Sequence, residues 1–290
     1  MPPILPEDPE QNSPQKRAFG PGAGPTENSA FDLTAPSFER HRSLPAGASE
    51  TIRAAIYATA GISPPARVLD IGAGTGRIGR AFVDANDFYI GLDTSLAMLQ
   101  EFHSRSPRCI LVHSEGGQLP FIDGSFDIVL LMQVLSGAND WRSILTEALR
   151  VLRPGGYVSV GQIVSSESGV DAQFKRQMRA ILDQLQLASH RPGEARGEAL
   201  AWLKSASARH EHRVAHSWQV TASAREFLDR HRTGARFAAL PCGVQRLVLE
   251  RLRNWAETTF GSLDTPFPET RSYEVNVFQF QRGAEREFRT

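Results

Sequence analysis

One ten-residue stretch decides the fold: Val68-Leu69-Asp70-Ile71-Gly72-Ala73-Gly74-Thr75-Gly76-Arg77. The apolar run at its start predicts a buried strand, and glycine at every second position predicts a tight turn into a helix. Glycine has no Cβ, so the backbone can take otherwise costly dihedral angles and a ligand can approach it within contact distance. In parallel α/β sheets, ligands bind at the carboxyl ends of strands, where this turn falls. The stretch therefore predicts a ligand site on a parallel sheet.

The spacing of these glycines differs from the dinucleotide fingerprint G-x-G-x-x-G, because Gly76 comes one residue early and Arg77 occupies the fingerprint position. Asp70 precedes the first glycine by two positions, where its carboxylate suits a cofactor with a charged amino-acid moiety. Asp93 ends the next predicted strand, where a carboxylate can accept hydrogen bonds from both hydroxyls of a ribose. Two alternatives stay open: the glycines serve strand-to-helix geometry alone, and Asp93 or Ser95 caps a helix.

Helical and strand-like segments alternate from residue 50 onward. The early pattern predicts helices over 49–60 and 141–152 and strands over 67–71, 88–92, 109–113, 126–132 and 157–160. Later residues predict a helix along the stripe 174–185, a strand over 214–220, a helix over 244–255 and a closing strand over 273–280. This alternation predicts an α/β fold, a Rossmann-like three-layer sandwich with a mostly parallel seven-stranded sheet.

Composition divides the chain into an arm and one domain. Residues 1–28 are rich in proline and poor in apolar periodicity, so we expect a disordered arm. Residues 29–48 are expected to form an N-terminal lid segment, and residues 49–290 one domain. A helical insertion is expected after the fifth strand, around 165–212, and its part from 188 to 212 reads as a surface excursion.

Charge and cysteine content limit the function classes. Thirty-two Lys and Arg balance thirty-two Asp and Glu, so no overall field attracts DNA, tRNA or an anionic membrane, and a small-molecule substrate fits better. Cys109 and Cys242 lie far apart, without the spacing of a metal site or a disulfide framework. We expect no bound metal. Without a secretory pattern or a long apolar run, the sequence predicts a cytoplasmic protein, and it leaves a homodimer open.

Four separated segments together resemble one family. They are residues 68–79, 89–99, 114–127 and 149–156, the last reading Leu149-Arg150-Val151-Leu152-Arg153-Pro154-Gly155-Gly156. In this order and spacing the sequence resembles the class I S-adenosylmethionine-dependent methyltransferases, within the broad group that includes ubiquinone and menaquinone biosynthesis methyltransferases. The resemblance covers residues 65–162 and implies S-adenosyl-L-methionine as the cofactor.

The resemblance also implies a role for each matching residue. Asp70, Gly72, Ala73, Gly74 and Gly76 would line the methionine end of the cofactor, with Gln133 beside its amino-acid portion, Asp93 at the ribose, and Thr94 and Met98 at the edge and face of adenine. Glu115 stands where the family usually has Asp, followed by Gly116, and would accept the adenine amino protons while the Gly116 amide reaches a ring nitrogen. Because Glu is one methylene longer than Asp, either the adenine sits slightly displaced or a neighbouring group makes the contact. A plain structural role for Gln133 stays open.

Residues 31–42 resemble the aromatic and Arg-bearing segment that folds over the cofactor in relatives. Phe31 and Phe38 would shield the sulfonium, and Arg42 would meet a carboxylate. The alternative is a helix that merely packs on the domain.

Methyl transfer is an in-line displacement on a sulfonium, so alignment and exclusion of water can supply much of the catalysis and no catalytic residue is obligatory. The histidines at 190, 210, 212, 216 and 231 are read as surface or hydrogen-bonded residues, and we name no base. Three functions stay open. The first is O-, N- or C-methylation of a small molecule, the second is an RNA or protein methyltransferase, and the third is a non-catalytic S-adenosylmethionine-binding protein.

Overall fold

A computed structural model describes residues 32, 35–138, 140–187, 194–232, 237 and 240–281, so the arm predicted over 1–28 lies outside the described residues. Seven strands form one sheet in the order β3-β2-β1-β4-β5-β7-β6. Their bounds are β1 Arg67–Ile71, β2 Phe88–Asp93, β3 Ile110–His113, β4 Phe126–Met132, β5 Leu152–Ser165, β6 Arg209–Ala222 and β7 Phe267–Gln279. The first five strands pair in parallel, and β7 pairs antiparallel with both β5 and β6. The predicted mostly parallel sheet is confirmed.

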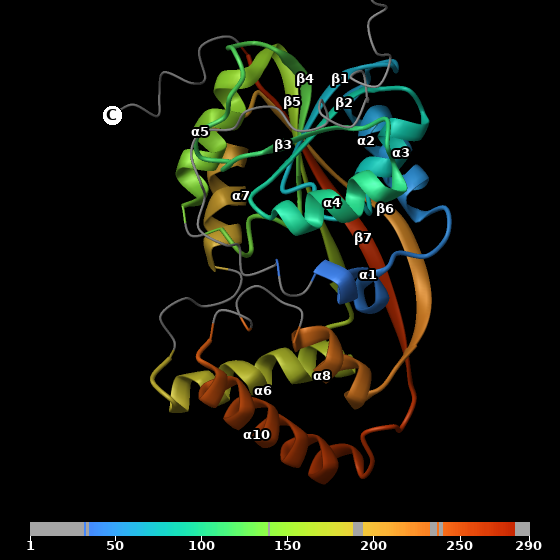
Figure 1. Ribbon diagram of the computed structural model, residues 1–290, viewed down its shortest axis with the longest axis vertical. Coiled ribbons are helices and arrows are strands. Elements are labelled where there is room, and N and C mark those ends of the chain that lie inside the picture. Colours follow the sequence, from blue (N-terminus) through green and yellow to red (C-terminus); the bar gives the residue numbers. More distant parts are fainter. Residues whose placement is uncertain are drawn as a thin grey trace, which may run out of the picture.

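Helices cover both faces of the sheet (Figure 1). One face carries α2 (Ala48–Ala60), α3 (Gly79–Asp84) and α4 (Leu96–Arg105), and the other carries α5 (Trp141–Val151) and α7 (Glu194–Ala206). Alternation along β1 explains the two cores: Val68 packs with the α2, α3 and α4 side, whereas Leu69 and Ile71 pack with the α5 and α7 side.

Several predicted segments differ from the structure, among them the closing strand, since β7 begins at Phe267 rather than at residue 273. The predicted strand 157–160 is too short, because β5 runs from Leu152 to Ser165 and pairs with β7 along most of that length. The predicted strand 214–220 is also too short, since β6 begins at Arg209 and pairs with β7 from there. The predicted surface excursion over 188–212 contains α7, whose residues Ala199 and Leu203 are fully buried.

Three further helices form a group at one end of the sheet (Figure 1). They are α6 (Val170–Gln184), α8 (Ala224–Arg232) and α10 (Cys242–Phe260), which we call the helical cap. The cap has its own apolar cluster, in which the ring of Phe174 lies 4.2 Å from that of Phe227 and 5.0 Å from that of Trp255. The short helix α1 (Ala35–Arg42) lies between the cap and the sheet. Within the described residues, no helix has the length and apolar character needed to cross a membrane.

Candidate cofactor site

The glycine turn follows β1 directly, at the carboxyl edge of the sheet. Gly72, Gly74 and Gly76 have φ angles of 76°, 55° and 79°, a region that residues with a Cβ rarely adopt. A Cβ on Gly72 would lie 2.4 Å from Val134, and one on Gly76 would lie 2.3 Å from the ring of Phe102. A Cβ on Gly74 would meet nothing within 4 Å. Two of the glycines are therefore needed because a neighbouring side chain leaves no room for a Cβ. The middle one, Gly74, borders open space where a ligand can approach the backbone.

Asp70 is a buried carboxylate with one oxygen available. Its side chain lies at the end of β1 with a residue exposure of 2%, and its Oδ2 accepts a 2.8 Å hydrogen bond from the Tyr89 hydroxyl. Its Oδ1 has no hydrogen-bond partner among the described residues. Burial raises the pKa of Asp70 to about 7, against the smaller lowering effect of the Tyr89 hydrogen bond. A buried acceptor without a partner is costly, so this oxygen fits a cationic donor such as the ammonium group of an amino acid.

The raised pKa of Asp70 makes folding pH-dependent. In the range between the ordinary pKa of 3.8 and the folded value of about 7, the folded protein holds a proton that the unfolded chain releases. The stabilisation is therefore fully present below the lower value and is lost as pH rises through the upper one. Asp70→Asn is neutral at every pH, so its unfolding free energy minus that of the wild type should increase from about pH 5 to about pH 8. Guanidinium titrations across this range measure the difference, and a flat difference would contradict the assignment.

Asp93 is hydrogen-bonded to the backbone of the glycine turn. Its Oδ2 accepts a hydrogen bond from the Gly74 amide at 2.8 Å, and its Oδ1 accepts one from the Ser95 amide at 2.9 Å. Ser95 is the N-cap of α4, because its Oγ accepts from the Met98 amide, so Asp93 is not the capping residue. Burial raises the pKa of Asp93 against these backbone hydrogen bonds. Each carboxylate oxygen keeps a second lone pair, so binding of ribose hydroxyls stays a prediction that this geometry allows.

The residues predicted at the adenine end lie along the same edge. The Thr94 carbonyl oxygen is 2.9 Å from His113 Nε2, and the Met98 side chain is buried in the first turn of α4. The Ser114 amide donates to the Asp93 carbonyl, which holds the next segment beside β2. In that segment Glu115 is exposed, and a Cβ on Gly116 would lie 2.8 Å from Ile71. Contact of these residues with adenine stays a prediction.

Gln133 follows β4 and has a left-handed backbone, with φ of 64°. Its backbone amide donates to the Gly161 carbonyl oxygen at 2.9 Å, and its side-chain Oε1 accepts a 2.5 Å hydrogen bond from Arg77. Since β4 is the neighbour of β1, this places Gln133 beside the glycine turn. Its contact with the cofactor's amino-acid portion stays a prediction. In the sequence, Arg77 stands out only because it occupies the position of the third glycine of the dinucleotide fingerprint, and no pattern indicates a role for Tyr89.

The N-terminal segment lies on this turn. Glu39 of α1 accepts a 2.5 Å hydrogen bond from the Thr75 hydroxyl and forms a 3.3 Å ion pair with Arg105. Asp32 accepts a 2.6 Å hydrogen bond from the Ser95 hydroxyl. Phe31 lies outside the described residues. The segment is therefore held at both the turn and the start of α4, and its role as a lid stays a prediction.

Phe38 and Arg42 connect the turn to the helical cap. The ring centre of Phe38 lies 5.2 Å from the guanidinium carbon of Arg77 and 5.4 Å from that of Arg42. Arg77 also donates to the Arg42 carbonyl oxygen, and Arg42 donates to the Arg230 carbonyl oxygen at 3.2 Å. The predicted contact of Arg42 with a ligand carboxylate is not tested by these contacts.

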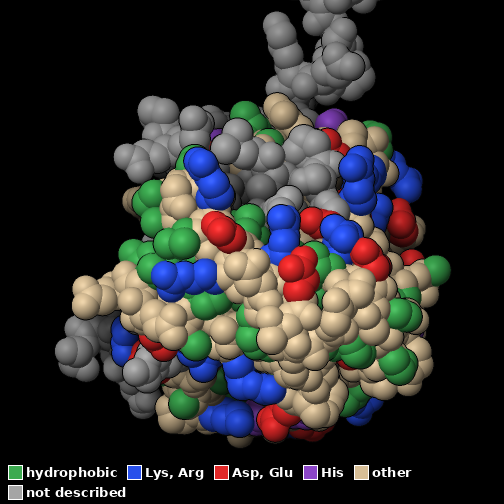
Figure 2. Space-filling view, turned by 90° about the horizontal axis from the view of Figure 1, so that it is seen from below, with side chains coloured by type: hydrophobic (Ala, Val, Ile, Leu, Met, Phe, Trp, Pro, Cys, Tyr) green, Lys and Arg blue, Asp and Glu red, His purple; other side chains and the backbone are tan. Residues whose placement is uncertain are grey.

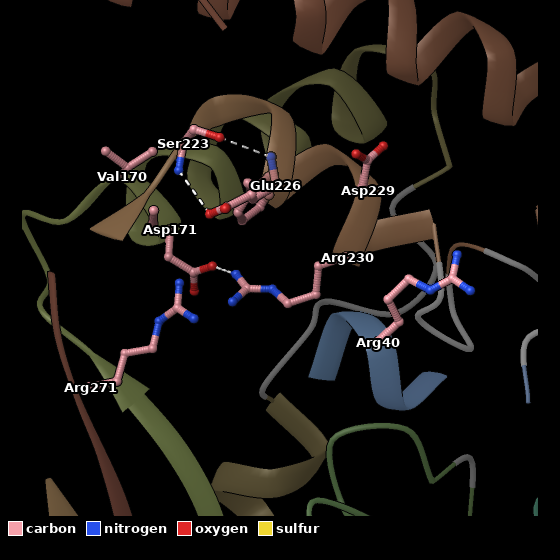
Figure 3. A pocket seen from close by; sticks show the side chains of 10 residues that line it. Arg40, Val170, Asp171, Ser223, Glu226, Asp229, Arg230 and Arg271 are labelled. Atoms are coloured by element: carbon pink, nitrogen blue, oxygen red, sulfur yellow. Dashed lines mark hydrogen bonds and ion pairs between the residues drawn. The ribbon is translucent and has the colours of Figure 1, made fainter. Parts of the chain in front are cut away.

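A cavity of about 310 Å³ lies between α1, the cap and β7 (Figure 3). Its lining is polar and carries both signs of charge: Arg40, Val170, Asp171, Ala222, Ser223, Glu226, Phe227, Asp229, Arg230 and Arg271. Arg230 forms an ion pair with Asp171, and Arg271 pairs with Glu269 at 2.9 Å. Burial lowers the pKa of Arg230 to about 9, with smaller contributions from Arg271 and Arg42. The cavity suits a small polar molecule rather than an extended apolar one.

The histidines have structural partners. His210, His212 and His216 lie on β6 and contact Asn276, Glu274 and Thr51 at 3.0, 3.0 and 2.9 Å. His231 lies in the cap, where its Nδ1 is 3.2 Å from the Phe227 carbonyl oxygen and burial lowers its pKa. His190 lies outside the described residues. These contacts single out no histidine as a base.

Comparison with known proteins agrees with this geometry. Residues 69–160 match a family model described as a methyltransferase domain. A demethylmenaquinone methyltransferase of Renibacterium salmoninarum is 35% identical over 133 residues, covering 46% of this chain and 56% of the relative. A 27-O-demethylrifamycin SV methyltransferase of Amycolatopsis mediterranei is 31% identical, covering 38% of this chain and 44% of the relative. The chain thus spans about half the length of the curated relatives it matches.

Solved structures show the same fold. The crystal structure of a putative methyltransferase from Bacillus halodurans superposes with a TM-score of 0.52 at 17% identity, covering 79% of this chain and 98% of that one. The sheet order, the glycine turn after β1 and the matched segment point to one assignment. Residues 69–160 of this chain are therefore similar to a methyltransferase domain, which the demethylmenaquinone and demethylrifamycin methyltransferases also match over about half of their length.

Proposed function

We propose that this protein binds S-adenosylmethionine and transfers its methyl group to a small-molecule acceptor. The observation that carries the proposal is the meeting of Asp70, Gly74 and Asp93 at the carboxyl edge of the sheet, with Asp70 Oδ1 lacking a partner among the described residues. When bound, the cofactor supplies an electrophilic methyl group on a sulfonium. Asp70 would accept from its ammonium group, Asp93 from its ribose, and the Glu115–Gly116 segment would meet its adenine.

The chain's own contribution to the reaction is binding, orientation and exclusion of water. Well-oriented reactants gain about 7–11 kcal/mol from proximity, so methyl transfer needs no side-chain base. The segment around α1 covers the turn through Glu39 and Phe38, which supports a role in excluding water. We place the acceptor near the polar cavity, because Arg42 touches both Arg77 at the turn and Arg230 at the cavity wall.

Charge distribution favours a small acceptor over RNA. The chain has no net charge, and Figure 2 shows Lys and Arg interleaved with Asp and Glu on the face seen from the cap end. A nucleic-acid site would gather basic residues on one face. Both reported relatives are named for small acceptors, which supports the same choice. The acceptor atom, whether oxygen, nitrogen or carbon, is left to experiment.

We also propose a cytoplasmic location. Cys109 is a buried free thiol and Cys242 an exposed one, which suits a reducing compartment. We further propose that the chain can form a homodimer, and light scattering, which measures the molar mass in solution, tests this.

Calorimetry tests the cofactor, and labelled cofactor tests the acceptor. The protein should bind S-adenosylhomocysteine with one site per chain. With methyl-labelled S-adenosylmethionine and separated metabolite, RNA and protein fractions, label should enter the metabolite fraction. Label in RNA or protein would favour the second function class, and binding without any transfer would favour a non-catalytic protein. Absence of binding by folded protein would overturn the proposal.

A further inference from the structure

Two guanidinium groups and one carboxylate meet in the polar cavity. Arg230 comes from α8, Arg271 from β7 and Asp171 from α6, and Figure 3 shows their charged ends pointing toward one another. These three elements are separated in the sequence, so the packing of the cap beside β7 creates the cluster. We call the three residues the inner wall of the cavity.

The carboxylates beside the inner wall are buried and already paired with cations of the protein. Asp171 is 3% exposed and pairs with Arg230 and, at 2.7 Å, with Lys175. Glu269 is 5% exposed, and its Oε2 lies 3.0 Å from Nε and 2.9 Å from Nη2 of Arg271. Its Oε1 has no hydrogen-bond partner among the described residues, but Glu269 does not line the cavity. A cationic ligand would therefore have to displace one of these cations.

The other charged side chains of the lining are directed elsewhere. Glu226 is exposed, and its carboxylate accepts a 3.2 Å hydrogen bond from the Ser223 amide just before α8. Arg40 is also exposed, and in Figure 3 the side chains of Arg40 and Asp229 point away from the inner wall. The charge beside the inner wall is therefore set by other residues.

Cations outnumber carboxylates around the inner wall. Among the described residues, four cations lie beside the two paired carboxylates: Arg42, Lys175, Arg230 and Arg271. The three arginines are partly buried, and Lys175 is exposed. Besides burial, the charges of Arg271 and Arg42 lower the pKa of Arg230, so these cations raise one another's energy. Buried charges are stabilised when they are paired, so an anionic group among them would be favourable.

The inner wall fits an acidic acceptor. Resting on the proposed function, we propose that the cavity binds a small-molecule acceptor that carries a carboxylate or phosphate group, and that Arg230 and Arg271 hold this group. A guanidinium presents its donors in a planar fork that matches either anion, and two forks from different elements can fix its orientation. The cavity volume of about 310 Å³ lies at the lower end of the range for small-molecule sites. An acceptor without an anionic group would leave the excess positive charge in place.

A purely structural role for these arginines makes a different prediction. If Arg230 and Arg271 only balance the buried carboxylates, their loss lowers stability and the rate at saturating acceptor. If they hold an anionic group of the acceptor, their loss raises the KM for the acceptor, and the affinity for S-adenosylhomocysteine stays unchanged.

The first experiment identifies the charge class of the acceptor. A metabolite extract is divided by ion exchange at neutral pH into acidic, neutral and basic fractions, and each is incubated with the wild type and methyl-labelled S-adenosylmethionine. Label should be transferred in the acidic fraction. The extract is divided before the reaction because methylation of a carboxylate would itself remove the charge.

The second experiment removes one cation together with its carboxylate, so that no buried charge loses its partner. In the acidic fraction, Arg271→Met combined with Glu269→Gln should raise the apparent KM, measured by dilution of the fraction, by about 30-fold or more, the scale of one lost buried charge pair. Glu269→Gln alone keeps the guanidinium and should stay within about threefold of the wild type. Arg225→Met is the matched control, since Arg225 lies on α8 with Arg230 and pairs with Asp264 at 2.5 Å without lining the cavity.

Transfer confined to the neutral or basic fraction overturns the acidic acceptor and leaves the proposed function standing, whether or not the double variant folds. A folded double variant with the KM of the wild type also overturns the proposal, even if its saturating rate falls. If the double variant fails to fold, Arg230→Met gives the same test, because Asp171 keeps Lys175 as a partner. Absence of transfer in all three fractions by protein that binds S-adenosylhomocysteine overturns the proposed methyl transfer and this inference together.

Discussion

Asp93→Ala should weaken binding of S-adenosylhomocysteine by about 10²- to 10⁴-fold, because each hydrogen bond to a charged group contributes about 1.5–3 kcal/mol and two ribose hydroxyls are lost together. The same substitution removes the acceptor of the Gly74 and Ser95 amides. The turn that approaches the ligand therefore loses its anchor as well. We expect a cost in unfolding free energy of about 1–3 kcal/mol from these two amides. Calorimetry measures the first effect and denaturant titration the second.

Two variants separate binding from support of the turn. Asp93→Asn keeps one acceptor oxygen for a backbone amide, so it should regain much of the stability and little of the affinity. Asp84→Ala removes an exposed acid from α3 and should change neither quantity. An affinity of Asp93→Ala equal to that of the wild type would refute the ribose assignment.

The strands that the sequence located best are those with a short continuous apolar run. β1, β2, β3 and β4 begin and end within one residue of their predicted bounds, because apolar runs mark them without reference to partners. β6 is different. It is the last strand in the sheet order, and Arg209–Arg213 carries polar side chains on both faces, so its strand conformation comes from pairing with β7. Such long-range pairing leaves no alternating apolar pattern to find.

Pairing also explains the boundary of β5. The segment Arg153–Gly156 contains Pro and Gly, which ordinarily end an element. Here Leu152 pairs with Phe126 and a register shift follows before Ile128, so the strand continues through an irregular start. The segment predicted as a surface excursion contains the helix α7. This helix packs on the domain because the ring of Trp202 meets that of Trp141 of α5 edge-on, with ring centres 6.1 Å apart.

The residues of the candidate site also differ in whether the sequence can predict their roles. Asp70, the three glycines and Asp93 can be predicted because their roles follow from their place at a strand end. Arg77 and Tyr89 cannot, because their roles depend on partners far away in sequence, such as Gln133 and Asp70. Neither residue type indicates a partner until the sheet brings β1, β2 and β4 together.

Phe174→Ala should lower the unfolding free energy by about 3–5 kcal/mol, the range for removing a buried aromatic ring from a core. Phe174 is fully buried in α6 and its ring contacts three others, those of Phe227, Trp255 and Phe260. These rings join α6, α8 and α10, so one truncation removes contacts to every helix of the cap. Thermal and denaturant unfolding of the full chain measure the loss.

Phe174→Ala should affect the cap and the cofactor site differently. Because Asp70, Asp93 and the glycine turn lie on the sheet, affinity for S-adenosylhomocysteine should stay within about threefold of the wild type under conditions where Phe174→Ala remains folded. Transfer to the acceptor should fall, since α6 and α8 supply the wall of the polar cavity. Phe88→Ala is the control, because Phe88 is 66% exposed and should change stability by less than about 0.5 kcal/mol. A Phe174→Ala protein as stable as the wild type would show that the cap is not a packed core, and unchanged transfer would remove the cavity from the acceptor site.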